Sequence, residues 1–326
     1  MNVIDSVVLA ISDILYQPWC VPLILIGGAI YLSFRCGFLQ FGMFRESCKV
    51  IMEKPHEGGV SSFGALMVST ASRVGTGNII GVSMAIVCGG PGAIFWMWIT
   101  AFFGGASAFV ESTLAQIFKK KDGPNASKGG PAFYMRDALG QRWLGVIFSC
   151  FIIFTYMIGY NMLAAYNLQS TFSVFRFYNE KATPIIIGLI LMILFGVVVF
   201  GGFGPVFICI AMIFFAFTTL IGNYSYCEGC FEFIIDREAK EYELKVMRVI
   251  ASVLIFLGAV ASAGLVWHLA DLAQALMVIT NVPSIIILGK IAFKCLDDYK
   301  AQMKEGKNPV FKASNIGLKQ ETDFWN

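Results

Sequence analysis

The sequence predicts an all-α polytopic membrane protein, and its composition and its long apolar runs both point to that class. Hydrophobic residues make up 57% of the 326 residues, and charged residues only 14%. A soluble domain carries roughly a quarter charged residues. We therefore expect a multi-pass membrane protein with the lipid bilayer as its main solvent. The net charge of +3 is spread over the loops and gives no reason to expect nucleic acid.

Apolar runs set the expected division of the chain. A run that crosses a bilayer needs about 20 residues, and eight runs qualify: 18–36, 61–88, 93–118, 143–166, 183–202, 203–226, 247–267 and 270–292. Residues 1–17 place apolar side chains near helical spacing and predict an interfacial segment. The expected parts are therefore 1–17, a bundle over 18–202, a second bundle over 203–292, and a polar tail over 293–326. The tail is lysine-rich and is expected to fray beyond about residue 305.

Basic residues orient the first half of the chain consistently, because cytoplasmic loops carry an excess of lysine and arginine. The segment before Arg35 has none, the first loop has four, and loop 119–142 has six. This pattern places the N-terminus outside and both loops inside.

The second half reverses the pattern. Counting on from an outside N-terminus, segment 234–248 should be external, yet it contains Arg237, Lys240, Lys245 and Arg248. The tail should also be external, yet it holds six lysines from Lys294 onward. If an odd number of spans were missing near Gly202–Phe203, segment 234–248 and the tail would both be assigned to the cytoplasm, as their basic residues favour. The alternative is that 183–226 is one segment, but its 44 residues are too long for a single crossing.

The stretch "STASRVGTGN" at 69–78 places polar residues in the middle of the second run. As one helix, run 61–88 would be about 42 Å long, more than the roughly 30 Å core requires. Gly75 and Gly77 lower the free-energy cost of unwinding the helix, so we expect Gly75–Asn78 to be non-helical. Broken helices of this kind hold substrate and ions in secondary transporters. The alternative is close helix packing through Gly77 and Gly81, which explains the glycines but not Arg73 or Asn78.

Arg73 would lie near the membrane midplane, where a lone charge is costly. Glu111 is the nearest plausible partner, so we expect a structural ion pair; the alternative is that Glu111 binds a coupling ion. Cys227 and Cys230 form a C-x-x-C, but no second pair or histidine cluster completes a zinc site. We therefore expect no cofactor and no structural metal.

Four motifs carry a family resemblance: "STASRVGTGNIIGVSMAIVCGGPGAIFWMW", "FVESTLAQIF", "KGGPAFYM" and "FAFTTLIGNYSYCE". Together they resemble the alanine or glycine:cation symporter family, typified by sodium:alanine symporters. The resemblance implies a LeuT-type inverted repeat of eleven spans with an external N-terminus and a cytoplasmic C-terminus. Eight spans would then be an incomplete fold, with 18–202 as the first repeat and 203–292 as a remnant of the second. The missing spans, six to eight, would include the second broken helix.

The implied function is sodium-coupled symport of a small neutral amino acid, alanine or glycine, by alternating access, and no enzyme activity. Two alternatives remain open: a non-transporting, internally deleted remnant, or a structural partner subunit of a membrane assembly.

The resemblance also implies the site residues. The substrate would contact Thr76, Gly77, Asn78, Asn161 and Asn223, and Na⁺ would contact Gly75, Thr76, Thr218 and Thr219. Backbone N–H groups at a half-helix N-terminus suit a carboxylate. Each group has a structural alternative: Thr76–Asn78 could serve helix packing, each threonine of α-helical run 203–226 could bond to its own i−4 carbonyl, and Asn223 could cap a helix. The family commonly reads N-x-x-Q-x-N in the fourth span, whereas Ala164 and Tyr166 stand at the last two polar positions here.

Overall fold

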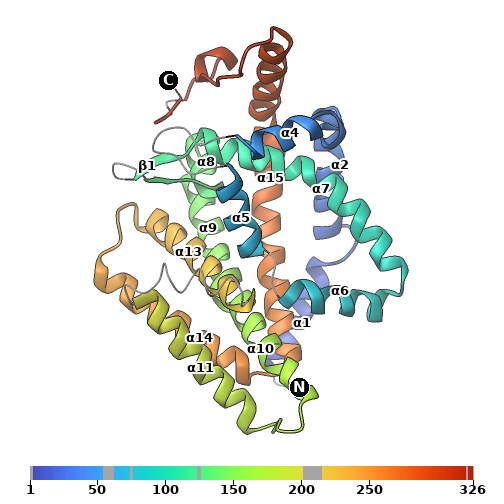
Figure 1. Ribbon diagram of the computed structural model, residues 1–326, viewed down its shortest axis with the longest axis vertical. Coiled ribbons are helices and arrows are strands. Elements are labelled where there is room, and N and C mark those ends of the chain that lie inside the picture. Colours follow the sequence, from blue (N-terminus) through green and yellow to red (C-terminus); the bar gives the residue numbers. More distant parts are fainter. Residues whose placement is uncertain are drawn as a thin grey trace. The chain divides into compact units, whose positions relative to one another are not determined.

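The computed structural model describes residues 3–53, 62–73, 76–122, 126–200, 215–320 and 322–325, and these are mostly helical (Figure 1). The chain divides into two compact units. The first unit comprises Met1–Leu15, Val60–Ile94 and Ser149–Leu276. The second unit comprises Tyr16–Gly59, Phe95–Phe148 and Met277–Asn326.

Most elements belong to one unit. The first unit contains α1 (Val3–Leu15), α5 (Ser62–Arg73), α6 (Thr76–Gly89), the π-helix η1 (Phe154–Tyr160), α10 (Asn161–Thr171), the 3₁₀ turn η2 (Phe172–Val174), α11 (Ala182–Phe200), α13 (Phe215–Ile235) and α14 (Glu241–Val260). The second unit contains α2 (Val21–Arg35), α3 (Leu39–Gly42), α4 (Phe44–Ile51), β1 (Lys120–Asp122), β2 (Ala126–Lys128), α8 (Pro131–Asp137) and the 3₁₀ turn η3 (Ala313–Ile316). Residues of both units occur in α7 (Gly92–Ile117), α9 (Arg142–Ile153) and α15 (Ala263–Lys304).

Three described helical stretches are long and apolar enough to cross a membrane: Gly92–Ile117, Arg142–Thr171 and Ala263–Lys304. Shorter apolar helices occur at Ser6–Leu15, Val21–Arg35 and Ala182–Ile193. The expectation of a helical membrane protein is therefore confirmed. The count of eight spans and the division at residue 202 stay predictions.

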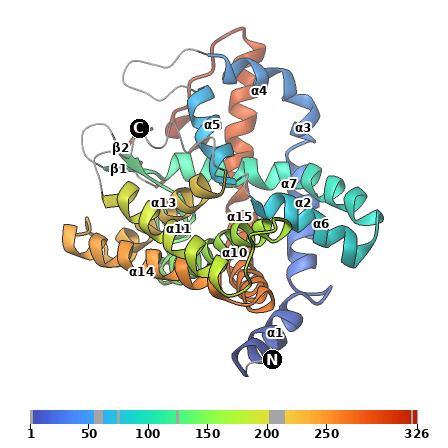
Figure 2. The same cartoon turned by 60° about the horizontal axis from the view of Figure 1, so that its bottom comes forward.

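The core of the first unit forms where α10, α11, α13 and α14 pack together. Gly188, near the start of α11, faces Phe256 and Ala259, near the end of α14, so the two helices run antiparallel (Figure 2). A methyl group on Gly188 would lie 3.0 Å from the Phe256 ring. The close approach buries Leu191, Phe195 and Ile255 in one apolar cluster.

Replacing Gly258 by alanine should destabilise the first unit, because this glycine of α14 lies directly against the backbone of α10. An added Cβ would lie 2.6 Å from the Met162 carbonyl oxygen, and backbone cannot move aside as a side-chain end can. Overpacking of this kind costs about 1–3 kcal/mol. Thermal unfolding in detergent measures the effect, and Gly229→Ala on α13 is the matched control because its added Cβ meets no atom within 4 Å. Equal melting of the two variants would contradict the close packing.

The second unit packs α2 against the C-terminal part of α15. Gly28 faces Val282 and Ile286, and Leu32 is fully buried nearby. Gln40 links α3 to the backbone of α7, donating from Nε2 to Ser33 Oγ over 2.9 Å and to the Phe102 carbonyl over 3.1 Å. These contacts hold the N-terminal part of this unit in one arrangement.

The expectation that the tail frays beyond about residue 305 is wrong. Helix α15 continues to Lys304, and the following residues form the turn η3 and bury Ala313, Ile316 and Thr322. The lysine content of the tail is typical of a solvated segment, but it says nothing about the few apolar side chains between the lysines. Those side chains give the tail its packed conformation.

Candidate functional site

The polar stretch lies at a boundary between two helices. Helix α5 ends at Arg73 and α6 begins at Thr76, and the two helices point in different directions (Figures 1 and 2). Val74 and Gly75 lie outside the described residues. The expectation that Gly75–Asn78 is non-helical is wrong for Thr76–Asn78, which form the first turn of α6. A helix that begins at Thr76 already leaves its first N–H groups without partners inside the helix, so these residues can be helical and still present donors.

The N-terminus of α6 has the chemistry of a carboxylate site. The first N–H groups and the helix dipole favour negative charge at this end. Gly77, in the second position, has no side chain to obstruct an approaching ligand. The Asn78 side chain is exposed, whereas the environment of the Thr76 side chain is outside the described part of the structure.

Two of the predicted substrate residues are brought together by the fold. Asn223 of α13 donates from Nδ2 to Oδ1 of Asn161 on α10 over 3.0 Å. Both side chains are buried, with 2% and 0% of their surface exposed. The amino group of the same Asn161 amide, Nδ2, has no hydrogen-bond partner. A buried donor without a partner is costly, and it is a group that a bound ligand could satisfy.

The helices that carry this amide pair also contact the two halves of the interrupted segment. Helix α10 packs against α6, and α13 packs against α5. Asn161 directly follows the π-helix η1, and π-helical turns occur frequently at functional sites. Gly159 in η1 allows the backbone of α15 to approach, since a methyl group there would lie 3.0 Å from the Ala270 Cα.

The predicted sodium ligands of α13 lie near the same amide. Thr219 precedes Asn223 by four residues, so the two side chains occupy one face of the helix. Thr219 is half-buried. The Thr218 side chain and Gly75 are outside the described residues, so the sodium site stays a prediction.

The predicted ion pair between Arg73 and Glu111 also stays a prediction. Arg73 is the last residue of α5 in the first unit, and its side chain is outside the described part. Glu111 is half-buried on α7 in the second unit.

Sequence reasoning missed two polar features of the same region. Asn167 of α10 is 1% exposed, and neither atom of its amide has a hydrogen-bond partner. Tyr160 donates its hydroxyl hydrogen to Gln274 Oε1 of α15. An amide inside a 30-residue apolar helical stretch was the available signal for Asn167. Ala164, where the family commonly has glutamine, belongs to the apolar cluster of α13 and α14.

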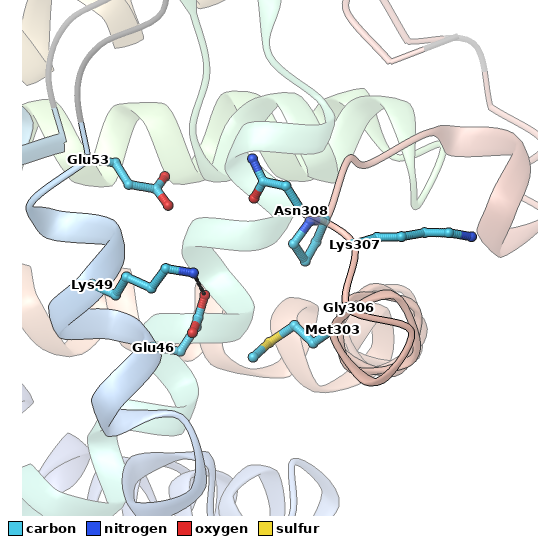
Figure 3. A pocket seen from close by; sticks show the side chains of 8 residues that line it. Glu46, Lys49, Glu53, Met303, Gly306, Lys307 and Asn308 are labelled. Atoms are coloured by element: carbon cyan, nitrogen blue, oxygen red, sulfur yellow. Dashed lines mark ion pairs between the residues drawn. The ribbon is translucent and has the colours of Figure 1, made fainter.

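A cavity of about 440 Å³ in the second unit is lined by none of these residues. It lies between α4 and the segment after α15 and is lined by Glu46, Lys49, Glu53, Met303, Gly306, Lys307, Asn308 and Pro309 (Figure 3). Glu46 pairs with Lys49 at 3.7 Å and accepts a hydrogen bond from Tyr299 at 3.1 Å. The ion pair lies within α4, and the bond from Tyr299 links α4 to α15. Within the described residues, no group of three or more His, Cys, Asp or Glu side chains could hold a metal ion.

Comparison with known proteins decides the family. The model of the sodium:alanine symporter family matches residues 1–205 and 200–313. The chain belongs to this family. The family is one of cation-coupled amino-acid carriers, and the chain is a membrane protein.

Two curated relatives from Bacillus subtilis align over almost their whole length, and an archaeal one aligns over part of it. The amino-acid carrier protein AlsT of Bacillus subtilis is 28% identical over 440 aligned positions, covering 93% of this chain and 94% of AlsT. The probable sodium/glutamine symporter GlnT of the same organism is 30% identical, covering 95% and 94%. The sodium/alanine symporter AgcS of Methanococcus maripaludis is 36% identical over 203 positions, covering 60% and 44%.

These alignments show that the chain is shorter than its relatives and that the unmatched positions lie within the aligned region. The alignment with AlsT has 440 positions, whereas 93% of 326 residues is about 303, so about 137 positions face a gap in this chain. The two matches of the family model meet at residues 200–205, where the basic-residue pattern reverses. About 137 residues correspond to roughly three spans with their loops. The shorter length is consistent with the predicted internal truncation, and the number of missing spans stays a prediction.

Proposed function

We propose that this protein binds a small neutral amino acid, alanine or glycine, together with Na⁺, and carries both across the plasma membrane by alternating access in a LeuT-type arrangement. The observation that carries the proposal is the buried pair Asn161–Asn223 with its spare donor. It lies on two helices that contact the halves of the interrupted segment. Buried polar groups of this kind mark substrate sites in membrane transporters.

The proposed roles follow from the chemistry of each group. The N–H groups of Thr76, Gly77 and Asn78 would hold the substrate carboxylate, and Asn161 and Asn223 would contact the substrate with their amides. Backbone and hydroxyl oxygens of Gly75, Thr76, Thr218 and Thr219 would coordinate Na⁺, which prefers oxygen ligands as other hard cations do.

The substrate is expected to be small and apolar in its side chain. Ala164 and Tyr166 stand where the family commonly has amides, and Ala164 lies in an apolar cluster. A site without amides at these two positions has fewer hydrogen-bond partners for a polar substrate side chain. This argument favours alanine or glycine over glutamine, although one relative is named for glutamine.

The test is uptake of labelled alanine, glycine and glutamine into proteoliposomes with and without an inward sodium gradient. We expect uptake of alanine or glycine that needs the gradient and falls at least about tenfold in Thr76→Val, because the variant lacks the hydroxyl ligand. Equal uptake in sodium and in potassium would contradict sodium coupling, and preferred uptake of glutamine would contradict the substrate class.

A second candidate is a non-transporting remnant that binds its ligands without completing the cycle. The total of about 137 unmatched positions favours it, because the two matches of the family model meet at residues 200–205, where the resemblance places the family's missing second broken helix. The expected result is sodium-dependent binding of alanine to the purified chain, measured by calorimetry, without exchange across proteoliposomes. Exchange of labelled for unlabelled alanine would exclude this candidate.

A further inference from the structure

The C-terminal segment folds back onto a lysine-rich loop of the second unit. Asp323 accepts a hydrogen bond from Lys120 Nζ over 3.1 Å and one from the Lys121 backbone N–H over 3.0 Å. Lys120 also pairs with Asp137 of α8 at 3.4 Å. One aspartate of the tail therefore contacts β1, and through Lys120 it is linked to α8.

Aromatic residues of the tail add contacts that do not depend on Asp323. Lys119 Nζ lies 4.6 Å from the Phe324 ring centre and 5.2 Å from that of Trp325, within the range of cation–π attraction. Trp325 donates from Nε1 to the Gln116 carbonyl at the end of α7 over 2.9 Å. Phe311 packs edge-on against Trp325 with ring centres 5.7 Å apart.

The same segment is fastened to α15 at its other end. Gln302 exchanges two hydrogen bonds with the Val310 backbone, at 2.9 and 3.1 Å. Lys294 Nζ donates to the Ile316 carbonyl over 3.3 Å. The tail is thus attached on one side to the C-terminal part of α15, and on the other to β1 and the end of α7.

We propose that residues 309–320 and 322–325 form a strap, a conformational lock that holds the hairpin β1–β2 to the C-terminal part of α15. Helix α8 is attached to α15 without the strap, because Tyr134 donates its hydroxyl hydrogen to Asn281 Oδ1. With the strap in place, the hairpin cannot move independently of α15; with the strap released, the hairpin can move while α8 stays attached. The backbone N–H of Lys121 and then the Lys120 ammonium lower the pKa of Asp323. The carboxylate therefore stays ionised at neutral pH, as its bonds to Lys120 and Lys121 require. The proposal does not depend on which solute the protein carries.

Limited trypsin digestion and hydrogen exchange of the full chain in nanodiscs test the strap. Truncation after Asn308 should raise cleavage at Lys119–Lys121 at least about tenfold and speed exchange of the hairpin amides, because local opening governs both rates. Asp323→Ala and Trp325→Ala should each give a smaller increase, and the double variant should approach the truncation.

Lys307→Ala is the matched control. It removes an exposed ion pair with Glu305 that lies just before the proposed strap. Digestion of this variant should stay within about twofold of wild type, because exposed pairs contribute little. The point variants keep the test valid if the truncated chain does not fold. Unchanged cleavage and exchange in the Asp323→Ala/Trp325→Ala double variant would overturn the proposal.

Discussion

Replacing Asn161 by leucine should remove amino-acid binding and destabilise the chain, whereas replacing Asn167 by leucine should do neither. Asn161→Leu leaves the Asn223 amide buried without its acceptor, and a stranded buried polar group costs about 1–3 kcal/mol. The same change removes the spare Nδ2 donor that we assign to the substrate. We expect the affinity for alanine to fall on the order of 100-fold, since sites built to hydrogen-bond a ligand lose strongly when the partner is absent.

Asn167 is the matched control because it is an equally buried amide on the same helix. Neither of its side-chain polar atoms has a partner, so leucine at this position strands no other group and adds apolar surface to the interior. Sodium-dependent alanine binding and thermal unfolding, measured on both variants, compare the two positions. If Asn167→Leu lost binding as fully as Asn161→Leu, the Asn161–Asn223 pair would not be the determining group.

The helices and part of the site were predictable because each depends on local patterns. Runs of apolar residues mark membrane helices regardless of their partners, so α7, α9–α10 and α15 follow from the sequence. The boundary between α5 and α6 was predictable from glycine and hydroxyl residues in an overlong run. The meeting of Asn161 and Asn223 was expected only through the family motifs, because 62 residues separate them.

The strap could not be predicted, and the reason is physical. Its contacts join residues about 200 positions apart, such as Lys120 and Asp323. Composition reports how many lysines the tail has, but not which carbonyl, carboxylate or ring each one meets. Asp323, Phe324 and Trp325 are a short acidic–aromatic group in a basic tail, and only the fold shows that they face Lys119–Lys121.

A reporter fused to the C-terminus should be found in the cytoplasm, although a count of eight crossings from an external N-terminus places it outside. Loop 119–142 has six basic residues, which predict a cytoplasmic position for it. Asp323 lies 3.1 Å from Lys120 of that loop, and two segments on opposite sides of a core about 30 Å thick cannot touch. Green fluorescent protein should therefore fluoresce when fused after Asn326, and alkaline phosphatase at the same position should be inactive.

A cytoplasmic tail requires an even number of crossings after residue 142, yet five apolar runs follow it. The antiparallel packing of α11 and α14 indicates which of the five runs does not cross the membrane. It puts the end of α11 and the start of α14 on the same side. That side is the cytoplasm if Arg142–Thr171 crosses outward and α11 returns. Arg237, Lys240, Lys245 and Arg248 are then cytoplasmic, as their charge favours, and run 203–226 contributes no net crossing.

In a background without the nine native cysteines, an impermeant maleimide should label Glu180→Cys from outside but not Glu238→Cys, both positions being exposed. External labelling of Glu238→Cys, or an active phosphatase on the tail, would show that all eight runs cross.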